Sequence, residues 1–186
     1  MKRLRLNWWL ILASVGGLAY PLFVYYGITT IPPTALVLVG LGLIGIRLLG
    51  LRQTDNTKTF QLAFLIAAVV LALLLFLNPL LAVKAYPIIV SLSVCTIFGL
   101  SLLFPPTLIE RIARIAEPNL PPAGVIYTRN VTIIWTIFLL LNAAVSATTA
   151  LWGTLDQWTL WNGFISYILM GSLFLGEMIV RRIVRR

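Results

Sequence analysis

The chain contains no histidine, one cysteine and five acidic residues among its 186 residues. Without histidine it lacks the side chain that most often acts as a general base or binds zinc, iron or haem in proteins. The lone Cys95 excludes an intramolecular disulfide and a cysteine-ligated cluster. The sequence therefore predicts no metal site, no cofactor and no catalytic triad, and we expect a protein that is not an enzyme.

Charge is also scarce: 10% of the residues are charged, whereas 60% are hydrophobic. The mean hydropathy of +1.01 is far above that of an ordinary soluble domain. Because a bilayer core about 30 Å thick needs roughly 20 apolar residues per helix, the sequence predicts an all-α, polytopic membrane protein whose single domain, residues 1–186, is one six-helix bundle. The predicted spans are approximately residues 8–26, 34–51, 60–77, 86–104, 131–152 and 158–180.

The basic residues predict how this bundle is oriented. If every second connection is cytoplasmic, all lysines and arginines except Lys84 fall on the cytoplasmic side, and Arg47 is counted there with its neighbours. Lys and Arg concentrate in cytoplasmic loops of membrane proteins, so both termini are expected in the cytoplasm. The net charge of +9 then predicts contact with anionic lipid headgroups rather than with nucleic acid.

The connection after the fourth span carries the clearest local motif. Pro105 and Pro106 end that span, and Thr107 followed by Glu110 has the spacing of a capping box, in which Glu110 reaches back to the backbone of Thr107. A short amphipathic helix over residues 107–117 is therefore predicted to lie in the cytoplasmic membrane interface. Its predicted polar side carries Glu110, Arg111, Arg114 and Glu117.

Several charged groups from separate segments are expected at the same cytoplasmic depth. One interpretation is a network of ion pairs at the membrane boundary. The other is a site for an anionic headgroup or a partner protein, in which the arginines bind phosphate or carboxylate. The candidate residues are Glu110, Arg111, Arg114, Glu117, Tyr127, Arg129, Glu177 and Arg181.

Polar residues also follow one stripe inside the last two predicted spans. A polar stripe in a membrane helix must face protein or water, so these side chains either bond across helices or line a polar cavity. The candidate residues are Trp135, Asn142, Ser146, Asn162 and Tyr167.

Small residues form two further patterns. Gly40, Gly42 and Gly45 have the spacing of a dinucleotide-binding loop, but they lie in an apolar span without a polar loop. We interpret them as a helix-packing face, together with the stripe of Ser91, Cys95 and Gly99 in the fourth span.

Short segments along most of the chain resemble the YciB-type inner-membrane proteins, the intracellular septation protein A family. The segments are 20–23, 84–89, 108–111, 120–121 and 161–164, with Trp135, Phe138 and Asn142. The sequence departs from that family at Val83–Pro87, where the family has a Phe-Ile-Lys-Trp-Lys type segment, and at Trp161–Phe164, which lacks the lysine of the family's Val-Asn-Phe-Lys type segment. The resemblance implies a multi-pass protein of the bacterial inner membrane that supports septation or elongation through protein contacts and has no catalytic residues.

A closer resemblance is to a branch of small bacterial membrane proteins that share the motifs Glu-Arg-Ile-Ala-Arg, Glu-Pro-x-Leu-Pro-Pro, Tyr-Thr-Arg and Trp-Asn-Gly. Here these motifs occupy residues 110–114, 117–122, 127–129 and 161–163. The resemblance implies an association with genes for aryl polyene or fatty-acid-like lipid synthesis.

Three functions are therefore compared. The first is a non-enzymatic protein that supports cell-envelope biogenesis by binding lipids and envelope-synthesis or division proteins. The alternative is a small translocator or carrier of a lipid, acyl or polyene intermediate, which requires a cavity between the last two spans. A transferase using Glu110 or Glu177 as a base ranks last, because the sequence supplies neither a nucleophile nor a metal site. Assembly with a second copy of the chain is compatible with each function.

Overall fold

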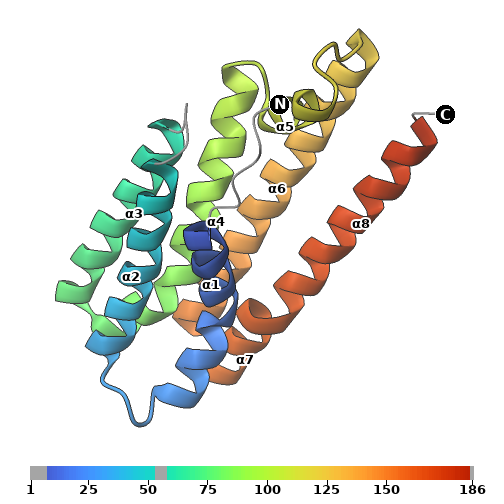
Figure 1. Ribbon diagram of the computed structural model, residues 1–186. Coiled ribbons are helices and arrows are strands. Elements are labelled where there is room, and N and C mark those ends of the chain that lie inside the picture. Colours follow the sequence, from blue (N-terminus) through green and yellow to red (C-terminus); the bar gives the residue numbers. More distant parts are fainter. Residues whose placement is uncertain (1–7, 53–57, 185–186) are drawn as a thin grey trace.

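A computed structural model describes residues 8–52 and 58–184 of the chain, and every regular element in these two stretches is a helix. The prediction of an all-α protein is confirmed. Figure 1 shows helices of alternating direction packed side by side. The elements are α1 (Trp8–Gly27), α2 (Pro33–Arg52), α3 (Lys58–Leu77), α4 (Pro79–Leu103), α5 (Leu108–Ala116), α6 (Pro122–Trp152), α7 (Leu155–Leu160), the π-helical turn η1 (Trp161–Ile165) and α8 (Ser166–Val184).

Within the described residues, five helical stretches are long and apolar enough to cross a membrane. In α1 the apolar stretch Ile11–Gly27 is shorter than these five. Many large apolar side chains are exposed on the outside of the bundle, such as Phe76 and Trp152. Apolar surface of this extent is expected where the surroundings are lipid rather than water. The five stretches are Pro33–Leu51, Lys58–Leu77, Pro79–Leu103, Pro122–Trp152 and Leu155–Arg182.

Two helices begin earlier than predicted because their starts depend on capping rather than on hydropathy. The fourth predicted span was expected to begin at residue 86, but α4 begins at Pro79, where the Asn78 side chain accepts a hydrogen bond from Leu81 N at 3.0 Å. The fifth was expected at residue 131, but α6 begins at Pro122. Proline is favoured at the first helical position because it has no N–H group to leave unpaired.

The last predicted span consists of three consecutive elements. A capping box starts α7: the Thr154 hydroxyl accepts from Gln157 N, and the Gln157 side chain accepts from Thr154 N. The chain then forms η1 before it continues as α8. Such π-helical turns widen a helix locally and are frequent at functional sites.

Small residues let α4 and α6 approach one another, as the sequence predicted. Ser91 Oγ donates to Leu139 O at 3.2 Å and Cys95 Sγ to Thr136 O at 3.5 Å. A Cβ at Gly99 would lie 3.8 Å from the Thr136 methyl group. This stripe is therefore a helix-packing face.

The glycines of α2 fulfil that prediction only in part. A Cβ at Gly40 would come within 3.0 Å of the Tyr86 ring, so this glycine admits a close neighbour. The same addition at Gly42 or Gly45 would meet nothing within 4 Å. Packing explains Gly40 alone, and the prediction is wrong for the other two.

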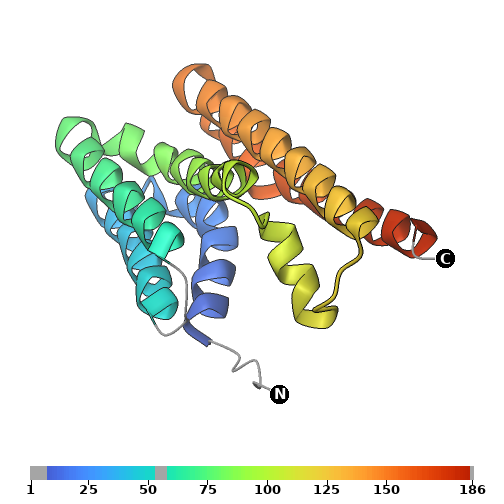
Figure 2. The same ribbon diagram turned by 90° about the horizontal axis from the view of Figure 1, so that it is seen from above.

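The helix α4 is central: it contacts α2 and α3 on one side and α5 and α6 on the other. Tyr86 of α4 packs on Tyr20 of α1 with ring centroids 4.3 Å apart, and the fully buried Trp158 donates its indole N–H to Lys84 O at 3.1 Å. Seen from above, α8 lies on the α6 side of the bundle and extends away from α1, α2 and α3, which lie on the other side (Figure 2). It adjoins the rest of the molecule mainly through η1.

Candidate functional site

A cavity of about 380 Å³ lies between α1, α2, α4, α6, η1 and α8. Its wall is mostly apolar, and one group of polar side chains interrupts it. Small-molecule sites in proteins have this volume and this mixture of lining groups. The polar lining residues are Ser14, Arg47, Tyr86, Ser91, Asn142, Asn162, Ser166 and Tyr167.

Arg47 lines this cavity and does not extend into the connection after α2. It lies inside α2, which continues to Arg52. Its Nη2 donates a long hydrogen bond of 3.5 Å to Ala13 O, and its guanidinium carbon lies 5.4 Å from the centroid of the Phe64 ring. No carboxylate in the described part of the chain forms an ion pair with Arg47. Among the described residues, the positive charge in this cavity thus has no carboxylate counterion.

Gly17 of α1 provides the space into which this guanidinium turns. A Cβ at that position would lie 2.9 Å from Arg47 Nη2 and 3.2 Å from the Tyr86 hydroxyl. A cation and a hydroxyl group thus meet beside Gly17, in the middle of α1, and Tyr167 lines the same cavity.

Two buried polar atoms of the cavity wall have no hydrogen-bond partner in the structure: the Tyr86 hydroxyl oxygen and Asn142 Oδ1. The orientation of Asn142 follows from its neighbour. Ser91 donates its only hydroxyl hydrogen to Leu139 O, so it can only accept from Asn142 Nδ2, at 3.3 Å. In this arrangement the amide oxygen points away from Ser91 and receives no hydrogen.

Asn162 lines the same cavity, but its own hydrogen bonds are made. Its Nδ2 donates to Trp158 O at 2.9 Å, and the Ser146 hydroxyl of α6 donates to its Oδ1. Both side chains are buried. Asn162 therefore ties η1 to α6, and it shapes the wall rather than offering a free group to a ligand.

The structure thus places most of the predicted intramembrane residues together. Trp135, Asn142, Asn162 and Tyr167 line the cavity, and Ser146 supports Asn162. Sequence reasoning missed Arg47 and Tyr86. The available signal for Arg47 was a charged residue within the predicted 34–51 span.

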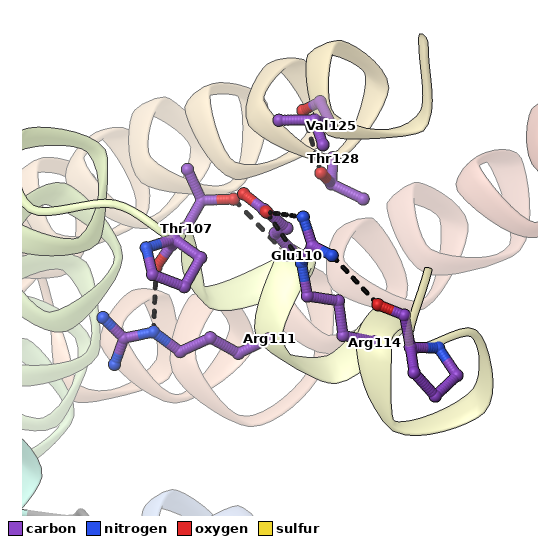
Figure 3. A network of polar contacts seen from close by, with 8 residues as sticks. Thr107, Glu110, Arg111, Arg114, Val125 and Thr128 are labelled. Carbon is purple, nitrogen blue, oxygen red and sulfur yellow. Dashed lines mark hydrogen bonds and ion pairs between the residues drawn. The ribbon is translucent and has the colours of Figure 1, made fainter. Parts of the chain in front are cut away.

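At the opposite end of α4, the Thr107 side chain caps the helix α5 as predicted, but Glu110 of its predicted polar side is buried. Glu110 N donates to Thr107 Oγ1 at 3.4 Å, whereas the Glu110 carboxylate accepts from Arg114 Nε and Nη2 at 2.9 and 2.8 Å (Figure 3). Glu110 is buried, and Ile112 and Ile115 are exposed. The predicted return bond from Glu110 to Thr107 is wrong, because Arg114 occupies the carboxylate.

Two shallower pockets divide the predicted cytoplasmic cluster. Arg111, whose Nε donates to Pro106 O at 2.8 Å, lines a pocket of about 340 Å³ together with Lys58. Glu117 and Arg181 line another of about 310 Å³ with Tyr127.

The remaining residues of that cluster lie outside both pockets. Arg129 is exposed and donates to Leu102 O at 3.3 Å, and Arg114 is held by Glu110. The Tyr127 hydroxyl is 3.3 Å from Glu177 Oε1. The four arginines predicted for an anion site therefore do not share one pocket.

Comparison with known proteins adds no assignment to this site. No protein-family model, no curated protein and no solved structure matches the chain. The resemblance to the intracellular septation protein A family is therefore still a prediction. In the part of the chain that the structure describes, no three histidine, cysteine, aspartate or glutamate side chains are grouped as ligands for a metal ion.

Proposed function

We propose that the protein is a non-enzymatic carrier of an anionic amphiphile in the bacterial inner membrane, and that it binds this molecule in the cavity around Arg47. One observation carries the proposal: a guanidinium that lines a cavity inside the bundle and has no carboxylate partner among residues 8–52 and 58–184. An arginine at the centre of a membrane helix costs about 3 kcal/mol on insertion scales, and the cost is smaller for Arg47, which lies nearer the C-terminal end of α2. A carboxylate or phosphate head bound beside Arg47 would offset this cost and form charge-assisted hydrogen bonds.

The rest of the cavity suits the apolar part of such a molecule. Farther along α4 toward α5, the wall beside the polar group around Arg47 is formed by side chains such as Val94, Phe98 and Trp135. The rings of Phe98 and Trp135 lie 6.2 Å apart and come from α4 and α6. An acyl or other apolar chain would bury its surface here at about 25 cal/mol per Å².

Exchange of Arg47 tests this proposal directly. Arg47→Gln removes the charge, and Arg182→Gln makes the same change at an exposed site on α8. We expect native mass spectrometry of the purified wild type to show a copurified anionic amphiphile. That adduct should be missing from Arg47→Gln and kept in Arg182→Gln. Retention of the same adduct in Arg47→Gln would contradict the proposal.

The carrier is proposed to cross the membrane six times, with α1 as the first span and both termini in the cytoplasm. The start of α3, the end of α4, α5 and the end of α8 lie at one end of the bundle (Figure 1), and this end carries most of the basic residues. Cysteine labelling tests the orientation in a Cys95→Ser background. An impermeant thiol reagent added to whole cells should label Lys84→Cys and leave Arg111→Cys unlabelled. Labelling of both would contradict this topology.

A second candidate function is support of envelope biogenesis through α5. The exposed Ile112 and Ile115 would enter the membrane interface, and the pocket of Lys58 and Arg111 would bind the headgroup of an anionic phospholipid. Envelope-synthesis or division proteins would then dock beside this helix, as the septation-protein resemblance implies.

Changes in that pocket distinguish this second function from the first. In discs of mixed anionic and zwitterionic phospholipids, Lys58→Gln with Arg111→Gln should lose bound anionic lipid, whereas Arg182→Gln should keep it. The adduct held by Arg47 should be unaffected. An unchanged lipid preference in the double variant would contradict the second function and leave the first intact.

A further inference from the structure

We infer that the Arg47 cavity opens sideways into the bilayer between α1 and α8, and that its ligand is a long-chain lipid acid taken from the membrane rather than an anion taken from water. The inference rests on the proposed function and names the class and the source of its ligand. Two observations carry it: the way α8 is attached to the bundle, and the apolar side chains around the opening.

The helix α8 is attached at its first turns and along one side. At the first turns, Gly163 of η1 packs on α1, where a Cβ would lie 3.5 Å from the Leu22 side chain and 3.6 Å from that of Pro21. From this contact α1 and α8 diverge toward the α5 end of the bundle (Figure 1 and Figure 2). Toward α6, α8 is fastened again near its far end, because the Tyr127 hydroxyl donates to the main-chain oxygen of Glu177 at 3.3 Å. The side of α8 that faces α1 is therefore the open one.

The cavity lies along this open side. Ser14 and Leu18 of α1 and Met170 of α8 belong to its wall. Both α1 residues are exposed and Met170 is half-buried, so this edge of the cavity reaches the outside of the described bundle. Counted along the helices, Ser14 and Met170 lie equally far from the contact at Gly163, about 10 Å on each side. These two residues form the edges of the opening.

The side chains just beyond these edges are apolar. One turn farther from Gly163, Ile11 on α1 and Phe174 on α8 are exposed, at about 15 Å from that contact on either helix. Ile11 belongs to the apolar stretch Ile11–Gly27, and Phe174 belongs to Leu155–Arg182. In hydrocarbon a small hydrated anion is costly, whereas an acyl chain is soluble. A molecule that reaches Arg47 by this route is therefore a lipid.

An acid with a long apolar chain fits this geometry. Its carboxylate or phosphate would bind Arg47 inside the cavity, and its chain would lie along the apolar wall of α4. A chain too long for a cavity of about 380 Å³ would leave between Ser14 and Met170 and continue among the membrane lipids. The cavity would thus accept chains of different length.

Photolabelling of the wild-type protein in phospholipid discs tests the inference. The probes are dodecanoic acid, hexadecanoic acid and hexadecyl phosphate, each with a diazirine at the chain end. At equal mole fraction in the bilayer, we expect the two fatty acids to bind within about threefold of one another, since the longer chain passes through the opening. Peptide mapping should place the hexadecanoic acid label on residues 11–18 or 170–174.

Competition separates the two sources of an anion. Labelling should fall when the same acid without a diazirine is added in excess, and it should not change when acetate or inorganic phosphate is added. Displacement of the label by acetate or inorganic phosphate would show that water reaches Arg47 and would overturn the inference. Exclusion of hexadecanoic acid while dodecanoic acid binds would also overturn it, because the cavity would then be closed.

A removable bridge across the opening tests the route of exchange. Ile11→Cys with Phe174→Cys, in a Cys95→Ser background, places one thiol on each edge, outside the cavity lining. A bifunctional thiosulfonate reagent joins the thiols, and a reductant releases them. We expect the bridge to slow transfer of bound hexadecanoic acid to protein-free discs at least tenfold, and the reductant to restore the rate. A monofunctional thiosulfonate on the same variant is the matched control and should leave the rate within about threefold. An unchanged rate in the bridged protein would contradict the route.

The outcomes separate the inference from the proposed function. Saturable labelling that Arg47→Gln removes, with no label near the opening, would overturn the inference and leave the carrier function standing. No saturable labelling by either fatty acid or by hexadecyl phosphate would overturn both. The wild-type labelling needs no variant, so it decides the inference even if the double cysteine variant fails to fold.

Discussion

The ion pair of α5 predicts an unequal response to the loss of its two partners. The Arg114 side chain is 37% exposed, whereas the Glu110 side chain is 7% exposed. If Glu110 is replaced by leucine, the Arg114 guanidinium can turn toward water. If Arg114 is replaced by leucine, the Glu110 carboxylate stays buried beside Ala113 without its cation. The second change should therefore be the more damaging one.

The magnitudes follow from these exposures. Removing one partner of a fully buried pair costs 3–5 kcal/mol, and exposed pairs are worth about 0–1 kcal/mol. We expect about 3 kcal/mol for Arg114→Leu, the low end of the buried range, because the pair opens to solvent on the arginine side. For Glu110→Leu we expect about 1 kcal/mol. The double variant should be more stable than Arg114→Leu alone.

Equilibrium unfolding by SDS in mixed micelles, followed by tryptophan fluorescence, measures these free energies. Arg111→Leu on the same short helix is the control, because Arg111 is exposed and donates only to backbone carbonyls. It should cost less than about 1 kcal/mol. Equal costs for Glu110→Leu and Arg114→Leu, or a double variant less stable than either single one, would refute the reasoning.

Two further predictions concern the cavity and the core. Gly17→Ala places a methyl group against Arg47 and should weaken binding of the acidic amphiphile at least tenfold. The control Gly42→Ala meets no neighbour, so it should leave binding unchanged and raise the free energy of unfolding by up to about 1 kcal/mol. Unchanged affinity in Gly17→Ala would contradict the proposed site. Trp158→Phe removes the indole hydrogen bond to Lys84 O and should cost about 1 kcal/mol in the same unfolding assay, with no loss if that bond is unimportant.

Helix content was predictable because the bilayer demands long apolar segments, but helix starts were not. Residue hydropathy cannot show that Asn78 caps α4 or that Pro122 opens α6, since the first start depends on one hydrogen bond from the backbone to a side chain and the second on the missing N–H group of proline. The π-helical turn at Trp161 leaves no periodic signal in so short a segment.

The candidate site was predictable as a polar stripe but not as a cavity. Spacing placed Asn142 and Asn162 on faces that must meet protein or water, and the structure shows that both line one space. Spacing did not show that Ser146 donates a hydrogen bond to the side-chain oxygen of Asn162. It also did not show that Asn142 donates to Ser91 while its own side-chain oxygen receives no hydrogen. That difference depends on which hydroxyl hydrogen is already used, which only the three-dimensional arrangement reveals.

Arg47 shows that counting charges by position does not reveal which way a side chain points. The rule assigns a charge to the nearest loop, but helical side chains lean toward the N-terminus of their own helix. In α2 that direction leads away from the α5 end and into the bundle. The guanidinium can follow it only because Gly17 of the neighbouring helix has no Cβ there. An arginine near the C-terminal end of a spanning helix can therefore face the interior when a glycine lies opposite it, and the Gly17→Ala binding measurement tests whether Arg47 binds a ligand there.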